Sequence, residues 1–104
     1  MGEAEFTGLL AARGYSEVQP LGPGRSQCDV TAVDSNGAKW AIEIKHRKSI
    51  NLTYYLIQAR ENARKAKGKW MLAIRLHGYR SWVILRQGVA PDLWHEEDEG
   101  PGHE

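Results

Sequence analysis

Two carboxylates and an amine, those of Asp29, Glu43 and Lys45, are spaced so that a β-hairpin would bring them together. Residues 39–47 have the β-branched and aromatic content of a strand, and side chains alternate along a strand, so Glu43 and Lys45 share one face. Residues 28–34 form the preceding strand. Like charges that face each other on a sheet are destabilising. A divalent cation between the carboxylates would offset that cost, and oxygen ligands without paired Cys or His favour Mg²⁺ or Mn²⁺ over zinc.

The turn between these two strands sets their register. Residues 34–37, Asp-Ser-Asn-Gly, have the small polar and glycine chemistry of a tight turn. Such a turn pairs positions whose numbers sum to about 71 to 73, so Asp29 lies opposite or diagonal to Glu43 with Cβ atoms roughly 5 to 8 Å apart. Lys45, next along that face, can hold a water or offset charge at a phosphate. The alternative is a solvated strand face with an ordinary Glu–Lys ion pair.

The charged hairpin has a known parallel. Asp29 followed by Glu-Ile-Lys at 43–45, in an apolar strand, resembles the D-x(n)-E-x-K signature of the PD-(D/E)xK, or restriction-endonuclease-like, nucleases. Residues 2–15 begin Gly-Glu-Ala-Glu-Phe and continue with Leu-Leu and Arg-Gly-Tyr. They are similar to the first helix of the small archaeal and phage Holliday-junction resolvases. The resemblance covers roughly residues 2–86, and Cys28 stands where the family name has proline.

The resemblance implies a metal site and two residues that act on water. The expected ligands of Mg²⁺, for which Mn²⁺ would substitute, are two carboxylates, one backbone carbonyl and a glutamate of the first helix: Asp29, Glu43, Ile44 and Glu3. Lys45 would orient or deprotonate the attacking water, and Gln58, on the helix after the strand, would position that water or the phosphate. A glutamate in a first helical turn is also favoured by the helix dipole, and a surface glutamine is the plain alternative for Gln58. No small-molecule cofactor is expected.

Basic residues surround this candidate site in three segments. A Gly-Pro loop at 21–27 delivers the chain to Asp29, a basic run follows the second strand, and a helix over 52–67 has a basic flank. The expected DNA contacts are Arg25, Ser26, His46, Arg47, Lys48, Arg60 and Arg64. Five of the 13 acidic residues lie in the last ten positions, where none of the 14 Lys and Arg residues falls. The rest of the chain is therefore basic, which suits a polyanionic partner, although basic faces are also often only solvated.

The elements that must position these residues form one α/β domain. With 104 residues and 41% apolar composition, the chain supports a single core. Hydrophobic spacing predicts a restriction-endonuclease-like α/β sandwich, with a mixed sheet of about five strands and a helix on each face. Residues 1–94 form this domain, with helices at 3–13 and 52–67 and strands at 17–20, 28–34, 39–47, 70–76 and 81–86. Residues 89–94 trail off, and we expect 95–104 to be a disordered acidic tail.

Composition also restricts the setting. One cysteine cannot form an internal disulfide, which favours a reducing compartment. No apolar run approaches the roughly 18 to 20 residues that cross a bilayer, and an N-terminus with Glu3 and Glu5 is unlike a signal peptide. We therefore expect a cytoplasmic protein without membrane contact, which in a phage-encoded case would act in the host cytoplasm.

The function that these inferences favour is a Mg²⁺-dependent, structure-selective endonuclease of the Holliday-junction resolvase type, making paired incisions in four-way junctions. Such a junction carries two symmetry-related scissile phosphates, so we expect a homodimer, with Ile57, Trp82 and Trp94 as interface candidates. Two alternatives stay open. One is the same chemistry on flaps, nicked or single-stranded DNA or a restriction-type target, and the other is a catalytically silent DNA-binding module.

Overall fold

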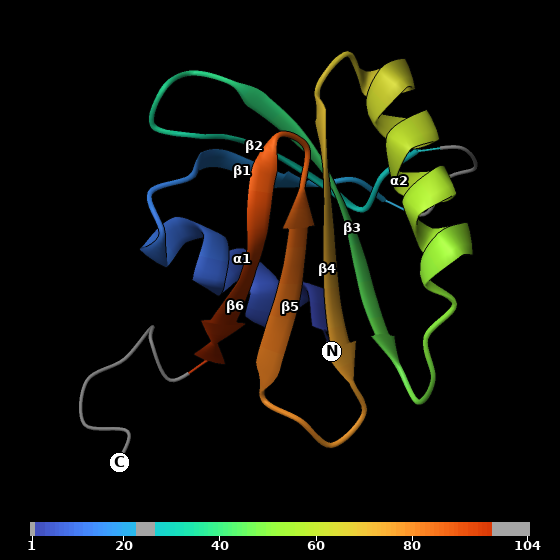
Figure 1. Ribbon diagram of the computed structural model, residues 1–104. Helices are drawn as coiled ribbons and strands as arrows, with labels where there is room; N and C mark the ends of the chain where they lie inside the picture. Colours follow the sequence, from blue (N-terminus) through green and yellow to red (C-terminus); the bar gives the residue numbers. More distant parts are fainter. Residues whose placement is uncertain (1, 23–26, 97–104) are drawn as a thin grey trace.

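Six strands and two helices make up the fold of the computed structural model, which describes residues 2–22 and 27–96, with side chains from Glu5 onward in the first helix. In chain order the elements are α1 (Gly2–Ala12), β1 (Ser16–Pro20), β2 (Val30–Val33), β3 (Lys39–Arg47), α2 (Leu52–Ala66), β4 (Lys69–Leu76), β5 (Ser81–Arg86) and β6 (Val89–His95). The described strands form one sheet in sequence order (Figure 1). Only β3 and β4 are parallel, because α2 crosses between them.

The β2–β3 hairpin has the predicted register. Val30 pairs with Ile42 and Val33 with Lys39, so paired numbers sum to 72. The turn is fixed by Asp34, whose Oδ1 accepts hydrogen bonds of 2.9 Å from the backbone N–H groups of Asn36 and Ala38. These bonds place Asp29 across from Glu43, as the alternation of side chains required.

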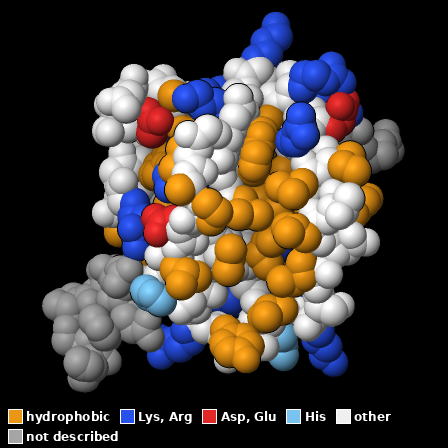
Figure 2. Space-filling model, viewed as in Figure 1, with side chains coloured by type: hydrophobic (Ala, Val, Ile, Leu, Met, Phe, Trp, Pro, Cys, Tyr) orange, Lys and Arg blue, Asp and Glu red, His pale blue; other side chains and the backbone are white. Residues whose placement is uncertain are grey.

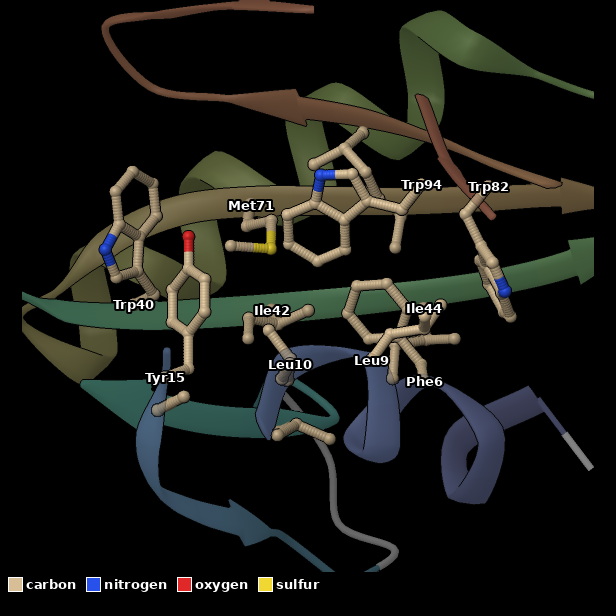
Figure 3. Close-up of a cluster of buried hydrophobic side chains, with 14 residues drawn as sticks. Phe6, Leu9, Leu10, Tyr15, Trp40, Ile42, Ile44, Met71, Trp82 and Trp94 are labelled. Carbon is tan, nitrogen blue, oxygen red and sulfur yellow. The ribbon is translucent and has the colours of Figure 1, made fainter. Parts of the chain in front are cut away.

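The two faces of the sheet carry separate cores. Trp40, Ile42 and Ile44 of β3 belong to a cluster on the α1 side. Figure 3 shows Phe6, Leu9 and Leu10 of α1 pointing into the same cluster. On the α2 side, buried Tyr55, Ala59 and Ala63 of the helix pack against alternate residues of β3 and β4. Glu43 and Lys45 therefore face α2, not solvent.

The prediction of Trp82 and Trp94 at an interface is wrong. Both rings are fully buried, and Trp94 stacks on Phe6 with ring centroids 5.5 Å apart. Trp94 belongs to β6, which makes a sixth strand where an irregular segment and five strands were expected. Ile57, in contrast, is exposed.

The folded part extends past the expected boundary at position 94. His95 is the last residue of β6 and pairs with Ser81, and the Glu96 carboxylate forms an ion pair with the buried Arg75. Arg75 also pairs with Glu5 of α1, at 3.0 Å between Nη2 and Oε1. These two bonds tie the end of the described chain to its beginning; residues 97–104 lie outside the described part. Neither described helix is long and apolar enough to cross a membrane.

Candidate active site

Asp29 stands where β2 separates from β3. Its backbone N–H donates to the carbonyl of Ile42 at 3.0 Å, which continues the ladder of the hairpin. Beyond this point the Asp29 side chain, not the backbone, bonds to β3: Oδ2 accepts a hydrogen bond of 2.8 Å from the backbone N–H of Ile44. The carboxylate oxygen thus accepts the hydrogen bond that a backbone carbonyl of a neighbouring strand would otherwise accept from β3. It is half-buried, next to the residue pair that carries the other charges.

Glu43 is a buried carboxylate with a partner on each side. Its side chain is on the α2 face of β3 and the residue is 2% exposed. Oε2 accepts a hydrogen bond of 2.6 Å from Nδ2 of Asn62, and Oε1 lies 3.8 Å from Nζ of Lys45. Burying an ionised carboxylate is costly unless it is hydrogen-bonded and paired, and here both conditions are met. Asn62 and Lys45 thus hold the Glu43 carboxylate in a fixed position under α2.

Lys45 is nearly as enclosed as its partner. The residue is 8% exposed, and Nζ lies 5.2 Å from the ring centroid of Tyr55 on α2. The ring face and the Glu43 carboxylate both attract the ammonium group. An amine held this way has little freedom to move, so it presents its remaining donors in a fixed direction.

Gln58 contributes an acceptor that the described residues do not satisfy. The residue is half-buried, and its Oε1 is buried without a hydrogen-bond partner in the described part of the chain. Gln58 is one helical turn before Asn62, so the two amides are neighbours on α2. A buried acceptor without a partner calls for a donor such as a water.

Cys28 lies beside both carboxylates. Burial raises the pKa of its thiol, hydrogen bonding from the Ile42 backbone works in the opposite direction, and the charges of Glu43 and Asp29 raise the pKa further. Sγ points to the carbonyl of Val30 at 3.5 Å. The thiol is therefore protonated at neutral pH, which makes it an uncharged part of the site wall.

Three of the expected site residues cannot be placed. The side chain of Glu3 and the residues Arg25 and Ser26 lie outside the described part of the chain. Glu5, the other glutamate of the first helical turns, binds Arg75 on the α1 face. It is therefore directed away from Glu43, which faces α2.

The expected DNA contacts that can be placed fall in two groups. Arg47 and Lys48 are exposed where β3 ends. His46 points to the α1 face, where its ring stacks on His77 with centroids 5.6 Å apart. Partial burial, then the charges of Arg75 and His77, lower the pKa of His46. His46 is thus neutral at neutral pH and adds no charge for a phosphate.

Arg60 and Arg64 lie together on α2, away from the amides. They line a recess of about 360 Å³ with Trp70 and Gln87. Arg64 also forms an ion pair with Glu61. The structure therefore brings together Asp29, Glu43, Lys45 and the α2 amides, and leaves Arg60 and Arg64 on a separate surface.

Asn62 is the site residue that sequence reasoning missed. The one signal for it is its position four residues after Gln58, on the side of a helix that must cover the charged face of β3. Nothing in the sequence alone specifies that an asparagine rather than a solvent molecule satisfies Glu43. The distance of 2.6 Å between Nδ2 of Asn62 and Oε2 of Glu43 identifies the asparagine as the donor.

A hard cation fits the donors that meet here. Asp29, Glu43 and the backbone of Ile44 offer only oxygen, the ligand that Mg²⁺ and Mn²⁺ prefer. Among the side chains that the structure describes, no three His, Cys, Asp or Glu residues come together around one point. A metal would therefore rely on two carboxylates, the carbonyl and any group from outside the described residues.

Comparison with known proteins identifies the fold. No protein-family model matches the chain, and no curated protein sequence matches it. Its structure is similar to the 1.6 Å resolution structure of Hjc from Archaeoglobus fulgidus, described as a Holliday junction resolvase from an archaeal hyperthermophile. The TM-score is 0.62 at 19% sequence identity, and the alignment covers 94% of this chain and 88% of that chain. The predicted restriction-endonuclease-like α/β fold is thereby confirmed.

Proposed function

We propose that the protein is a metal-dependent endonuclease that makes paired incisions in four-way DNA junctions. One observation carries the chemistry: Asp29 accepts from the Ile44 backbone while Glu43 and Lys45 share the adjacent strand face, buried under α2. Two carboxylates beside an enclosed amine match what phosphodiester hydrolysis needs. The fold that the chain shares with a Holliday junction resolvase supports the same reaction class.

The residues divide the work. Asp29 and Glu43, with the carbonyl of Ile44, would hold Mg²⁺ or Mn²⁺, and such an ion supplies charge stabilisation and a more acidic water. Lys45, as an ammonium, would orient the attacking water and offset the negative charge that develops on the phosphate. Gln58 accepts a hydrogen bond from that water, which would satisfy its unpaired Oε1.

Glu3 is proposed as a further ligand or outer-shell group. The reason is the resemblance of residues 2–15 to the first helix of the small Holliday-junction resolvases, in which the matching glutamate joins the metal site. Arg25, Ser26, Arg47 and Lys48 would bind the DNA backbone on the approach to the site. Arg60 and Arg64 would contact more distant phosphates, since they lie on a different side of α2 from Asn62, which contacts Glu43.

A homodimer is proposed because a four-way junction has two equivalent scissile phosphates. Figure 2 shows hydrophobic side chains gathered on the face where the sheet is not covered by α2. Here Val83, Leu93 and Tyr79, all large and exposed, surround a hollow of about 210 Å³. We assign this apolar face to a second copy of the chain, because monomers rarely leave such patches in water.

Two other functions remain to be compared by experiment. The same site could cut flaps, nicked or single-stranded DNA, because nothing in Asp29, Glu43 and Lys45 depends on strand branching. A silent DNA-binding module is disfavoured by burial: Glu43 and Lys45 cost folding free energy that a module without chemistry could avoid.

Cleavage of a panel of DNA substrates tests the proposal. Purified protein is incubated with Mg²⁺ or with EDTA and labelled four-way junction, flap, nicked, duplex and single-stranded DNA, and the cuts are mapped. We expect symmetric paired cuts in the junction, only with the metal. Asp29→Asn, Glu43→Gln and Lys45→Ala should each lower the cleavage rate at least a hundredfold, as loss of one charged stabilising group does.

Binding by the same variants is the control. Junction affinity, measured by gel shift in EDTA, should change less than a few-fold, because Glu43 and Lys45 are buried under α2 and Asp29 is half-buried. Circular dichroism checks that each variant is folded. Cuts that persist in all three variants would refute the assigned residues, and cuts confined to flaps or single strands would select the alternative substrate.

A further inference from the structure

A second polar pocket lies on the sheet face opposite Glu43 and Lys45. It has a volume of about 410 Å³ and is enclosed by the end of α1, the β2–β3 turn and the β5–β6 hairpin. Three cationic residues line it: Arg13, Lys69 and Arg86. We propose that this cationic pocket binds a phosphate group, supplied by the DNA backbone beyond the cleavage site or by a free nucleotide.

Aromatic rings hold the cations in place. The guanidinium carbon of Arg13 lies 4.8 Å from the ring centroid of Trp94, and that of Arg86 lies 5.7 Å from it. Nζ of Lys69 lies 5.5 Å from the ring centroid of Trp40. Both tryptophans are buried and line the pocket. Charges fixed over rigid rings lose little freedom when an anion binds, which favours affinity.

Arg86 has donor capacity left over. Its Nη1 donates to the hydroxyl of Tyr15 at 3.3 Å, and Nη2 lies 3.7 Å from Oδ2 of Asp92. Its buried Nε has no hydrogen-bond partner among the described residues. A guanidinium has five N–H donors, so this one can still bind anion oxygens.

The two aspartates of the pocket do not cancel these cations. Asp34 Oδ2 accepts from the indole N–H of Trp40 at 2.9 Å, and Asp92 Oδ2 accepts from that of Trp94 at 3.1 Å. Oδ1 of Asp34 accepts from the backbone N–H groups of the β2–β3 turn, and Oδ1 of Asp92 accepts from the backbone N–H of Leu93 in β6. These hydrogen bonds lower the pKa of both carboxyls. The aspartates therefore brace the indoles, and three cations against two anions leave a positive surplus.

The pocket is independent of the proposed nuclease site. Trp40 and Trp94 belong to the α1-side core, whereas Glu43 and Lys45 face α2. Phosphate binding here therefore does not rest on the nuclease assignment. A phosphate group bound here would lie across the sheet from the scissile one.

The four tryptophans of the chain give a direct test. In a ¹⁵N-labelled sample, the indole N–H signals of Trp40 and Trp94 report the pocket, whereas those of Trp70 and Trp82 report other places. Each signal is assigned with a Trp→Phe variant. Inorganic phosphate is titrated against chloride at equal ionic strength. We expect saturable shifts of the Trp40 and Trp94 signals and no shift of the Trp82 signal, because that ring is fully buried. No shift of the two pocket signals, or equal shifts of all four, would overturn the proposal.

Matched charge variants sharpen the result. Arg13→Gln with Lys69→Gln removes two exposed pocket cations and should weaken phosphate binding roughly tenfold or more, since a hydrogen bond to a charged group has about that effect. Lys39→Gln with Lys65→Gln removes two exposed lysines that do not line the pocket. That control should bind within twofold of the natural protein. Equal weakening in both pairs would mean general charge attraction and would refute a site.

The source of the phosphate is decided by two further ligands. A short duplex and thymidine monophosphate are titrated separately, without divalent metal. Shifts of Trp40 and Trp94 by the duplex, lost in the Arg13 and Lys69 variant, would assign the site to the DNA backbone. Shifts by the nucleotide alone would assign it to a free phosphate ester. If neither ligand moves these two signals, the proposal fails.

Discussion

Asp29 and Glu43 are held in place by different parts of the chain. Asp29 is fixed by a backbone N–H of β3, so the hairpin register alone determines its position. Glu43 is fixed by Asn62, so it depends on how α2 lies on the sheet. Alternation and turn chemistry predicted the first from sequence. The second could not be predicted, because the packing of a helix on a sheet depends on side chains throughout the core.

Asn62 is expected to position Glu43. Asn62→Ala leaves a buried carboxylate oxygen without its donor and should lower the free energy of unfolding by about 1 to 3 kcal/mol. Urea denaturation measures this. Asn62→Asp should cost more, because it sets two carboxylates against each other. Gln58→Ala is the stability control on the same helix: the Gln58 Oε1 has no hydrogen-bond partner among the described residues, so the loss of unfolding free energy should be smaller.

A readout of activity separates positioning from stability. The cleavage rate of Asn62→Ala should fall at a temperature where the variant is fully folded, while junction affinity stays within a few-fold. If Asn62→Ala unfolds at the same urea concentration as Gln58→Ala and cleaves as fast as the natural protein, Asn62 does not hold Glu43.

Cys28 is expected to be inert in the folded protein. Burial and the neighbouring carboxylates raise the pKa of its thiol above the ordinary 9.0, so the reactive thiolate is scarce below that pH. Iodoacetamide at pH 8 should modify it far more slowly than it modifies free cysteine. In urea, where burial and both charges are lost, the reaction should reach the ordinary rate. Mass spectrometry follows both reactions, and fast modification of the native protein would contradict the packing of Cys28.

At the scale of elements, helix α2 has a stabilising cap at its start and a strained residue at its end. Asn51 caps its start, with Oδ1 accepting from the backbone N–H of Tyr54 at 3.2 Å. Lys67 ends it in the left-handed conformation, with φ at 60°. That region favours glycine. Gly68, which follows, cannot take a side chain freely, because an added Cβ would lie 3.1 Å from the carbonyl oxygen of Lys39.

Replacing Lys67 should therefore stabilise the protein. Lys67→Gly relieves the left-handed strain and should raise the free energy of unfolding by up to about 1 kcal/mol. The same substitution two residues earlier, Lys65→Gly, falls inside the helix and should lower it by about 0.5 to 1 kcal/mol. Thermal unfolding of both variants measures the contrast. Destabilisation by Lys67→Gly would mean that the lysine side chain matters more than its backbone.

Strand β6 shows where sequence patterns fail at this scale. Residues 89–95 contain Pro91, and proline cannot donate to a strand ladder, so the segment looks irregular. In the structure β6 pairs only with β5, at the edge of the described sheet, and an edge strand tolerates proline. Only Trp94 within it is buried, so the usual alternation of apolar residues is missing. The strand is held to the core by the burial of a single large ring, and one apolar residue does not give the alternating pattern from which a strand is predicted.

At the scale of the whole molecule, the sheet is covered unevenly. One face packs against α1 across a core that reaches from β2 to β6. On the other face α2 contacts β3 and β4 and leaves the side of β5 and β6 uncovered (Figure 1). Arg75, buried between Glu5 and Glu96, ties both ends of the described chain together on the first face. The second face is thus the one available to a partner.

Dimerisation through that face is tested by a matched pair of valines. Val83 lies in the apolar hollow and is 42% exposed; Val89 is 43% exposed and lies outside it. Val83→Lys should convert a dimer to a monomer in sedimentation velocity, because a buried ammonium at a dimer interface has no partner. Val89→Lys should remain a dimer. Both side chains are at the surface, so both variants should fold.

The same pair links assembly to the reaction. Monomeric Val83→Lys retains Asp29, Glu43 and Lys45, so it should still nick a junction, but the two cuts should become independent. The natural protein should make the second cut before it dissociates from the singly cut junction. Supercoiled cruciform plasmid distinguishes them: paired cuts give linear DNA, and single cuts give nicked circles. Linear product from a monomeric Val83→Lys protein, or a monomeric natural protein, would mean that paired incision does not depend on this face.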